Sequence, residues 1–229
     1  FVTAAILSEY FKNISIKCVY SSSIGRIGVG ESTQLAINDV FQFLRLSDKE
    51  WMPKCNATYK TNIKFEGWSD ADFFYPFGDL TGDDVSDFFI LTHLFPDIKF
   101  NQFSRFHRYH SRFAELNRFT DDGWDFHDLT AYHFDTEKLA KVFYDVCLRN
   151  GVEFVDDKYI RANQSDDGSI VSLKCENGTH EADLFVDCTG FHSELLGKVM
   201  GVHYNSYADT LINHRAIAAK IPYTDKNKQ

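Results

Sequence analysis

The sequence lacks two features that would each have pointed to a distinct class of protein. No apolar run approaches the ~18 residues that a membrane-spanning helix needs, so we expect no membrane span. Basic residues are not in excess either, because 24 Lys and Arg stand against 33 Asp and Glu, which gives a formal net charge of −9. This balance argues against nucleic acid or an anionic membrane surface as the main partner.

Paired cysteines are also absent. The five cysteines are scattered and odd in number, and no C-x-x-C pair occurs. Such usage is typical of reduced thiols, so we predict a cytoplasmic protein. The best candidates for metal ligands are His107 and His110 in "FHRYH", but no cysteine or carboxylate cluster completes a site around them. We therefore predict no metal site.

What the sequence does contain is typical of a globular α/β protein. Apolar residues make up 44% and aromatic residues 16%, with 22 Phe, which suits a thick core or a pocket for a flat ligand. The expected strands cover 14–22, 61–68, 152–157 and 181–190, and a hairpin turns at Asp167-Gly168. One expected helix begins before Leu7, a second near Thr33 with Ser32 or Thr33 as its cap, and a third with Asp135 or Thr136 as its cap and Gly151 at its end. This order predicts a nucleotide-binding α/β fold, with an irregular, substrate-facing insertion at 69–130.

The segment "RIGVGEST" places two glycines and an acid between a predicted strand and a predicted helix. Gly28 and Gly30 let backbone amides approach a ligand closely, and a helix N-terminus favours anions. Glu31 is either a ligand-side acid or an ordinary acid at a helix start. Arg26 either reaches a phosphate or ribose of the ligand or lies on the surface. An ordinary glycine-rich turn remains the alternative for the whole segment.

A second candidate segment is "DLFVDCTGFHS". Asp187 and Gly190 follow a predicted apolar strand, and open α/β sheets bind ligands at the carboxyl ends of their strands. We therefore expect both residues to lie near a cofactor. A strand that simply ends in a turn is the alternative.

Lys60 in "NATYK" has two conflicting interpretations. If one strand runs through 60–65, Lys60 and Lys64 share a face opposite Ile63 and Phe65, which predicts an exposed lysine. The glycine-rich turn upstream and the flanking tryptophans favour a catalytic group instead.

Taken together, "RIGVGEST", "WMPKCNATYKTNIKF", "YPFG", "YHFD" and "ADLFVDCTGF" resemble, in order and spacing, the flavin-dependent tryptophan halogenases. The resemblance covers nearly all of residues 1–229. It implies an FAD/NAD(P)-binding, Rossmann-like fold of flavin monooxygenase type. It also implies that Lys60 is catalytic, that Glu31 lies beside the flavin, and that Phe77 stacks on an aromatic substrate.

The resemblance implies the chemistry as well. A separate flavin reductase supplies FADH2, and O2 and halide then give hypohalous acid at the flavin. Lys60 delivers this oxidant to an electron-rich, indole-like ring. A homodimer is compatible with the family. Two alternatives remain: a flavin-dependent hydroxylase of the same fold, which needs no relay lysine, and an inactive partial chain.

The sequence departs from the family pattern in several places. Tyr20 stands where an acid usually holds the ribose, and Tyr75 is followed directly by Pro76, without the substrate-side histidine. The first strand with its dinucleotide loop is expected before Phe1. The W-x-W-x-I-P motif, the glutamate that acts with the lysine and the C-terminal half are expected after Gln229. We therefore expect a partial FAD-binding halogenase domain.

Overall fold

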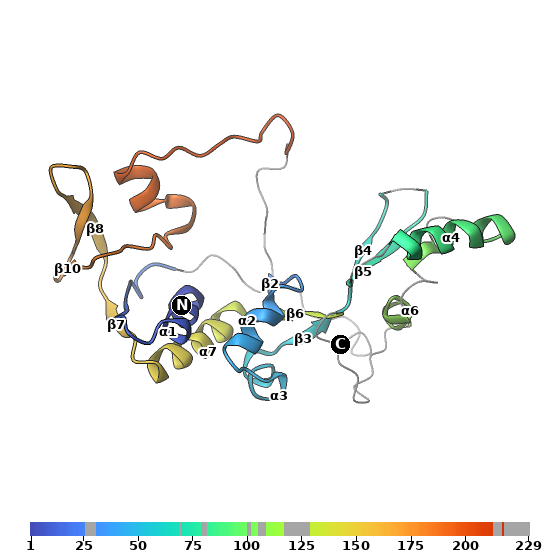
Figure 1. Cartoon of the computed structure of the whole chain (residues 1–229), viewed down its shortest axis with the longest axis horizontal. Coiled ribbons are helices and arrows are strands. Elements are labelled where there is room, and N and C mark those ends of the chain that lie inside the picture. Colours follow the sequence, from blue (N-terminus) through green and yellow to red (C-terminus); the bar gives the residue numbers. More distant parts are fainter. Residues whose placement is uncertain are drawn as a thin grey trace. The chain divides into compact units, whose positions relative to one another are not determined.

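The computed structural model describes residues 1–25, 31–68, 70–78, 82–99, 102–104, 109–116, 129–212 and 217 (Figure 1). These residues form two compact units, which we describe separately. The first consists chiefly of Thr3–Ile27 and Cys147–Ala219, and the second chiefly of Gly28–Val146. Helix α7 (Thr136–Arg149) contributes residues to both. Within the described ranges, no helix is both long enough and apolar enough to cross a bilayer.

The first unit contains helix α1 (Val2–Tyr10) and a parallel pair of strands, β1 (Lys17–Tyr20) and β7 (Glu153–Asp156). The pairing continues beyond the ends of both strands, because the Glu153 amide donates to the Ile16 carbonyl and the Asp157 amide to the Tyr20 carbonyl. The strands expected at 14–22 and 152–157 are therefore confirmed. Their parallel pairing is typical of an α/β fold.

The same unit contains a three-stranded antiparallel sheet, formed by β8 (Tyr159–Gln164), β9 (Ile170–Cys175) and β10 (Thr179–Glu181) in the order β10-β9-β8. The hairpin predicted at Asp167-Gly168 is confirmed. Gly168 adopts a φ of +86°, a left-handed conformation that glycine tolerates best.

The strand expected at 181–190 is wrong beyond Glu181. Within the described chain no strand pairs with this segment, which leads instead into the short helical turns η3 (Gly190–His192) and η4 (Glu194–Val199). Two of its apolar side chains are correspondingly open to solvent, since Leu184 is 79% exposed and Val186 is 53% exposed. The apolar pattern was present, but a strand also needs a neighbour for its backbone hydrogen bonds.

The second unit is built on a small antiparallel sheet, β2-β6-β3, made of β2 (Glu31–Ser32), β6 (Ala131–Phe134) and β3 (Thr58–Lys60). Helices α2 (Ile37–Phe43) and α3 (Asp48–Trp51) and the turn η1 (Pro53–Cys55) belong to the same unit. Its core is aromatic: the ring of Trp51 lies 4.3 Å from that of Phe41 and 4.9 Å from that of Tyr132. Asp48 stabilises this cluster by accepting hydrogen bonds from Trp51, Tyr59 and Tyr132.

The helix expected near Thr33 begins only at Ile37. Thr33 is held by the neighbouring strand, since its amide donates to the Tyr132 carbonyl at 2.9 Å and its hydroxyl accepts from the Tyr132 amide at 3.0 Å. Sheet pairing thus takes the residues that the sequence assigned to a helix cap. The helix cap predicted for α7 is confirmed, because the Asp135 carboxylate accepts from the amides of Glu137 and Lys138.

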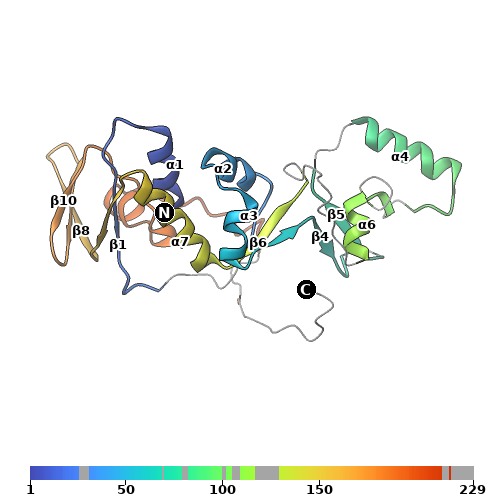
Figure 2. The same cartoon turned by 90° about the horizontal axis from the view of Figure 1, so that it is seen from below.

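Residues 69–130 are more regular than the sequence indicated. Strand β4 (Asn62–Phe65) pairs with β5 (Phe73–Pro76) as an antiparallel hairpin, and helices α4 (Gly82–Leu94) and α6 (Tyr109–Glu115) follow. Figure 2 shows α6 beside this hairpin. Two glycines lie near the ends of these elements, because Gly82 opens α4 and Gly78 lies two residues after the end of β5.

Candidate active site

Lys60 is the last residue of β3, where it lies opposite Ala131 of β6. It is only 9% exposed, so the expectation of a solvated lysine is wrong. The reason is local: the segment forms two strands, with Thr61 between β3 and β4, and the alternation does not run unbroken from 60 to 64. Lys64, on β4, is the exposed lysine of this segment and pairs with Glu66 and Asp72.

The ammonium of Lys60 has few partners. Its Nζ donates to the Thr33 carbonyl at 3.0 Å and lies 3.4 Å from the Ser32 hydroxyl oxygen. In the part of the chain that the structure describes, Lys60 forms no ion pair with a carboxylate. A buried charge without a counter-ion is unusual, because burial disfavours the charged form.

Phe77 supplies the third contact of Lys60. The Nζ atom lies 5.1 Å from the centroid of the Phe77 ring, within the range of a cation–π interaction. The hairpin brings the two residues together, since the Phe77 amide donates to the carbonyl of Thr61, the residue that follows Lys60. Phe77 is buried, so in this structure its ring faces the lysine rather than an open substrate surface.

The electrostatics of Lys60 follow from this environment. Desolvation lowers the pKa of the Lys60 amine below its ordinary value. By contrast, the pKa of Lys64 is raised, chiefly by its hydrogen bond to Glu66. Of the two neighbouring lysines, Lys60 is therefore the one that loses its proton more easily. A neutral amine is the form that nucleophilic chemistry needs.

Lys60 and Glu31, two of the predicted site residues, lie on opposite faces of the β2-β6-β3 sheet. Ser32 lies opposite His133, and His133 lies two residues from Ala131, so Ser32, His133 and Lys60 share one face. Glu31 precedes Ser32 and therefore lies on the other face, where it is exposed. Lys60 and Glu31 therefore cannot contact the same group on one face of this sheet.

His133 is a further neighbour of Lys60, which the sequence did not single out as a site residue. Its pKa is lowered by partial desolvation and then by the positive charge of Lys60, although much of its surface is exposed. Ser32 and Thr33 were likewise missed as contacts of Lys60. Their role could not be detected in the sequence because β2 is only two residues long, too short to show alternation.

Asp187 and Gly190 lie in the first unit. The Asp187 carboxylate accepts hydrogen bonds from the Thr189 amide and hydroxyl and from the amides of Leu195 and Leu196. Burial raises the pKa of Asp187, but these hydrogen bonds outweigh it and hold the pKa below its ordinary value. The carboxylate thus fixes the turn that carries Gly190, whose φ is +63° and beside which a Cβ would meet no atom within 4 Å.

Four predicted residues or motifs lie wholly or partly outside the described residues. They are Arg26, Gly28, Gly30 and the pair His107–His110, of which only the backbone of His110 is described.

Comparison with known proteins identifies the family. The tryptophan halogenase family model matches residues 1–228, so the chain belongs to the tryptophan halogenase family. Among curated proteins it is similar to the 7-chloro-L-tryptophan 6-halogenase KtzR of Kutzneria sp. (strain 744). The two are 36% identical over 96% of this chain and 48% of the relative.

Two further relatives extend the comparison to solved structures. The tryptophan 6-halogenase SttH of Streptomyces toxytricini is 32% identical over 96% of this chain and 47% of its own length. Its crystal structure matches with a TM-score of 0.80 and 31% identity, over 93% of this chain and 46% of that one. The structure of Tar14, a tryptophan C-6 flavin-dependent halogenase from taromycin biosynthesis, matches with a TM-score of 0.81 and 33% identity. The match covers 92% of this chain and 44% of that one.

These comparisons confirm the predicted α/β halogenase fold. The chain spans about half the length of the curated relatives it matches, as the shares of 48% and 47% show.

Proposed function

We propose that the protein is an FADH2-dependent halogenase of an electron-rich aromatic substrate, and that Lys60 carries the halogen to that substrate. The observation that carries the proposal is the burial of Lys60 without a carboxylate partner among the described residues, with a lowered pKa. Family membership supports the reaction class. The relatives are named as tryptophan halogenases, which favours an indole-like substrate.

The flavin fits the described residues in part. Gly190 leaves the backbone open to a close approach, Asp187 holds its turn in place, and Glu31 is exposed on the sheet face opposite Lys60. We propose that Glu31, Asp187 and Gly190 border the flavin, together with Arg26, Gly28 and Gly30. Reduced flavin, provided by a separate reductase, supplies hypohalous acid from O2 and halide when it is bound.

The Lys60 amine acts after this oxidant has formed. It holds hypohalous acid by a hydrogen bond, or it attacks the halogen, so that an N–halogen bond forms and water leaves. An aromatic ring carbon then takes the halogen, and the ring proton returns to the amine. Both routes benefit from a desolvated amine, because a neutral nitrogen keeps its lone pair available. Phe77 borders the Lys60 side chain, and we propose that it contributes to the aromatic substrate site.

The experiment compares Lys60→Ala, Lys60→Arg and the control Lys64→Ala in a single turnover of the full-length protein with reduced flavin, halide and an indole. We expect Lys60→Ala to lose halogenated product about 100-fold or more, since groups that stabilise a transition state contribute on that scale. Lys60→Arg is not expected to rescue it, because a guanidinium stays charged. Lys64→Ala should keep full activity. Hydroxylated rather than halogenated product from the wild type would instead support the hydroxylase alternative.

A further inference from the structure

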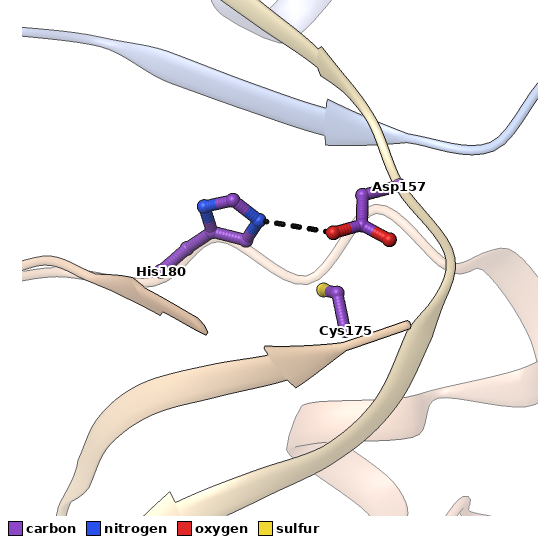
Figure 3. A group of neighbouring side chains, drawn as sticks. All are labelled: Asp157, Cys175 and His180. Atoms are coloured by element: carbon purple, nitrogen blue, oxygen red, sulfur yellow. Dashed lines mark ion pairs between the residues drawn. The ribbon is translucent and has the colours of Figure 1, made fainter. Parts of the chain in front are cut away.

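Three side chains in the first unit gather ligand atoms of three different kinds. Asp157 follows β7, Cys175 ends β9 and His180 lies on β10, and one ligand atom from each lies within 4.8 Å of the other two. Figure 3 shows the His180 ring facing the Asp157 carboxylate, with the Cys175 sulfur beside them. The sequence did not predict this group, because the three residues come from three separate strands or strand ends.

The sheet itself brings the group together. His180 lies opposite Leu173, and Cys175 is two residues further along β9, so both side chains lie on the same face. The turn between them is tight, with the Cys175 amide donating to the Gly178 carbonyl at 2.9 Å. Asp157 is fixed by Asn177, whose side chain donates to Oδ1 at 3.1 Å and whose amide donates to Oδ1 at 3.0 Å and, at a longer 3.3 Å, to Oδ2. The Oδ2 atom also lies toward His180, 3.5 Å from its Nε2.

The group is buried and its polar atoms are incompletely paired. Asp157 is 5% exposed and Cys175 is fully buried, whereas the His180 side chain is 15% exposed. The Nε2 atom of His180 lies 3.5 Å from Asp157 Oδ2, which is long for a hydrogen bond. Within the described residues this buried nitrogen has no hydrogen-bond partner. Buried polar atoms in native proteins nearly always have one, so the arrangement points to a missing ligand.

We propose that Asp157, Cys175 and His180 bind one Zn²⁺ ion. A carboxylate oxygen, a thiolate sulfur and an imidazole nitrogen are all ligands that zinc accepts, and three protein ligands leave a fourth position for water. On binding, the Cys175 thiol releases its proton to solvent and the thiolate binds the ion. The Nε2 atom of His180 and the Oδ2 atom of Asp157 are the other two protein ligands. Because zinc–ligand bonds are about 2.0–2.3 Å long, the ligand atoms draw closer together around the ion.

The ion would tie the end of β7 to the β9–β10 turn. Its site lies in the first unit and uses none of the residues proposed for halogenation. Gly178 lies directly beside the group, since a Cβ there would make ordinary van der Waals contacts at 3.7–3.9 Å with His180 and with Asp157 Oδ2. Zinc that binds only the folded chain must stabilise it.

The test uses Co²⁺ as a spectroscopic probe on chelator-treated wild-type protein, followed by displacement with Zn²⁺. A thiolate-to-cobalt absorption band that saturates with one ion per chain, and that Zn²⁺ abolishes, is expected. Cys175→Ser should lose the band, and His180→Gln should weaken Co²⁺ binding by about 10-fold or more. The controls Cys188→Ser and His203→Gln replace an exposed thiol and an exposed imidazole of the same unit, and both should bind as the wild type does.

Thermal melting gives a second readout. Zn²⁺ should raise the melting temperature of the wild type and of Cys188→Ser but not that of His180→Gln, whose partly exposed side chain makes it the variant most certain to fold. The proposal is overturned if the wild type shows no thiolate band. It is equally overturned if folded Cys175→Ser or His180→Gln binds Co²⁺ as tightly as the wild type.

Discussion

Replacing Lys60 by methionine should stabilise the fold while removing its function. Moving an ammonium out of water costs several kcal/mol even after the protein relaxes. Lys60 recovers part of this through its hydrogen bond to the Thr33 carbonyl and the Phe77 ring contact, whereas the Ser32 hydroxyl is 3.4 Å away and adds little. Among the described residues no carboxylate adds to these contacts. Such contacts contribute about 1.5–3 and about 1–2 kcal/mol respectively.

Methionine keeps most of the side-chain volume and needs no counter-charge, but it leaves the Thr33 carbonyl without the Lys60 donor. We therefore expect Lys60→Met to raise the free energy of unfolding by about 1 kcal/mol. The control Lys64→Met removes an exposed, ion-paired lysine and should change the free energy of unfolding by less than about 0.5 kcal/mol. The assay is equilibrium urea unfolding followed by tryptophan fluorescence.

The advantage of Lys60→Met should depend on pH. Desolvation lowers the pKa of folded Lys60 from its ordinary value of 10.5, so between the folded pKa and 10.5 the unfolded chain binds more protons than the folded chain. The stability of the wild type, relative to the variant, therefore rises with pH in that window. The difference between the two proteins is largest below the folded pKa and vanishes toward 10.5. A Lys60→Met protein destabilised by more than about 1 kcal/mol at neutral pH would refute this account of an under-compensated buried charge.

Asp48→Asn weakens an acceptor shared by three ring donors and should lower the free energy of unfolding by about 1–3 kcal/mol, whereas Glu50→Gln on the same helix should not, as urea unfolding will show. Asp135→Ala removes the cap of α7 and should cost about 1 kcal/mol by the same assay; a loss no larger than that of Asp145→Ala would argue against the cap. Glu31→Ala should weaken flavin binding to the full-length protein, measured by fluorescence quenching, and an unchanged affinity would remove Glu31 from the flavin site.

Local signals predicted much of the fold. Helix α7 was readable because Asp135 caps it and Gly151, with a φ of +78°, ends it. The hairpin at Asp167-Gly168 was readable because its turn needs a residue that tolerates a left-handed conformation. Both features depend on neighbours in the sequence, which is why no tertiary information was needed.

Features that depend on distant partners were not predicted. The segment 181–190 has the composition of a strand, but no described strand pairs with it. Thr33 has the chemistry of a helix cap, but Tyr132 takes its hydrogen bonds. The Asp157–Cys175–His180 group likewise exists only because three strands converge.

The site shows the same division. The resemblance to the halogenases selected Lys60 and Phe77, and the structure brings these two into contact. The burial of Lys60 could not be inferred from alternation, because the chain changes strand at Thr61.

If Lys60 receives the oxidant before the substrate does, the fate of the halogen in a single turnover reveals it most directly. The measurement is one turnover of the full-length protein with an indole and a small diffusible scavenger of hypohalous acid. It records how the halogen divides between the two. In the wild type and in Lys64→Ala, nearly all of it should reach the indole. In Lys60→Ala the same amount of flavin should be oxidised, but the halogen should pass to the scavenger. If Lys60→Ala still delivers the halogen to the indole in the wild-type proportion, Lys60 does not carry it.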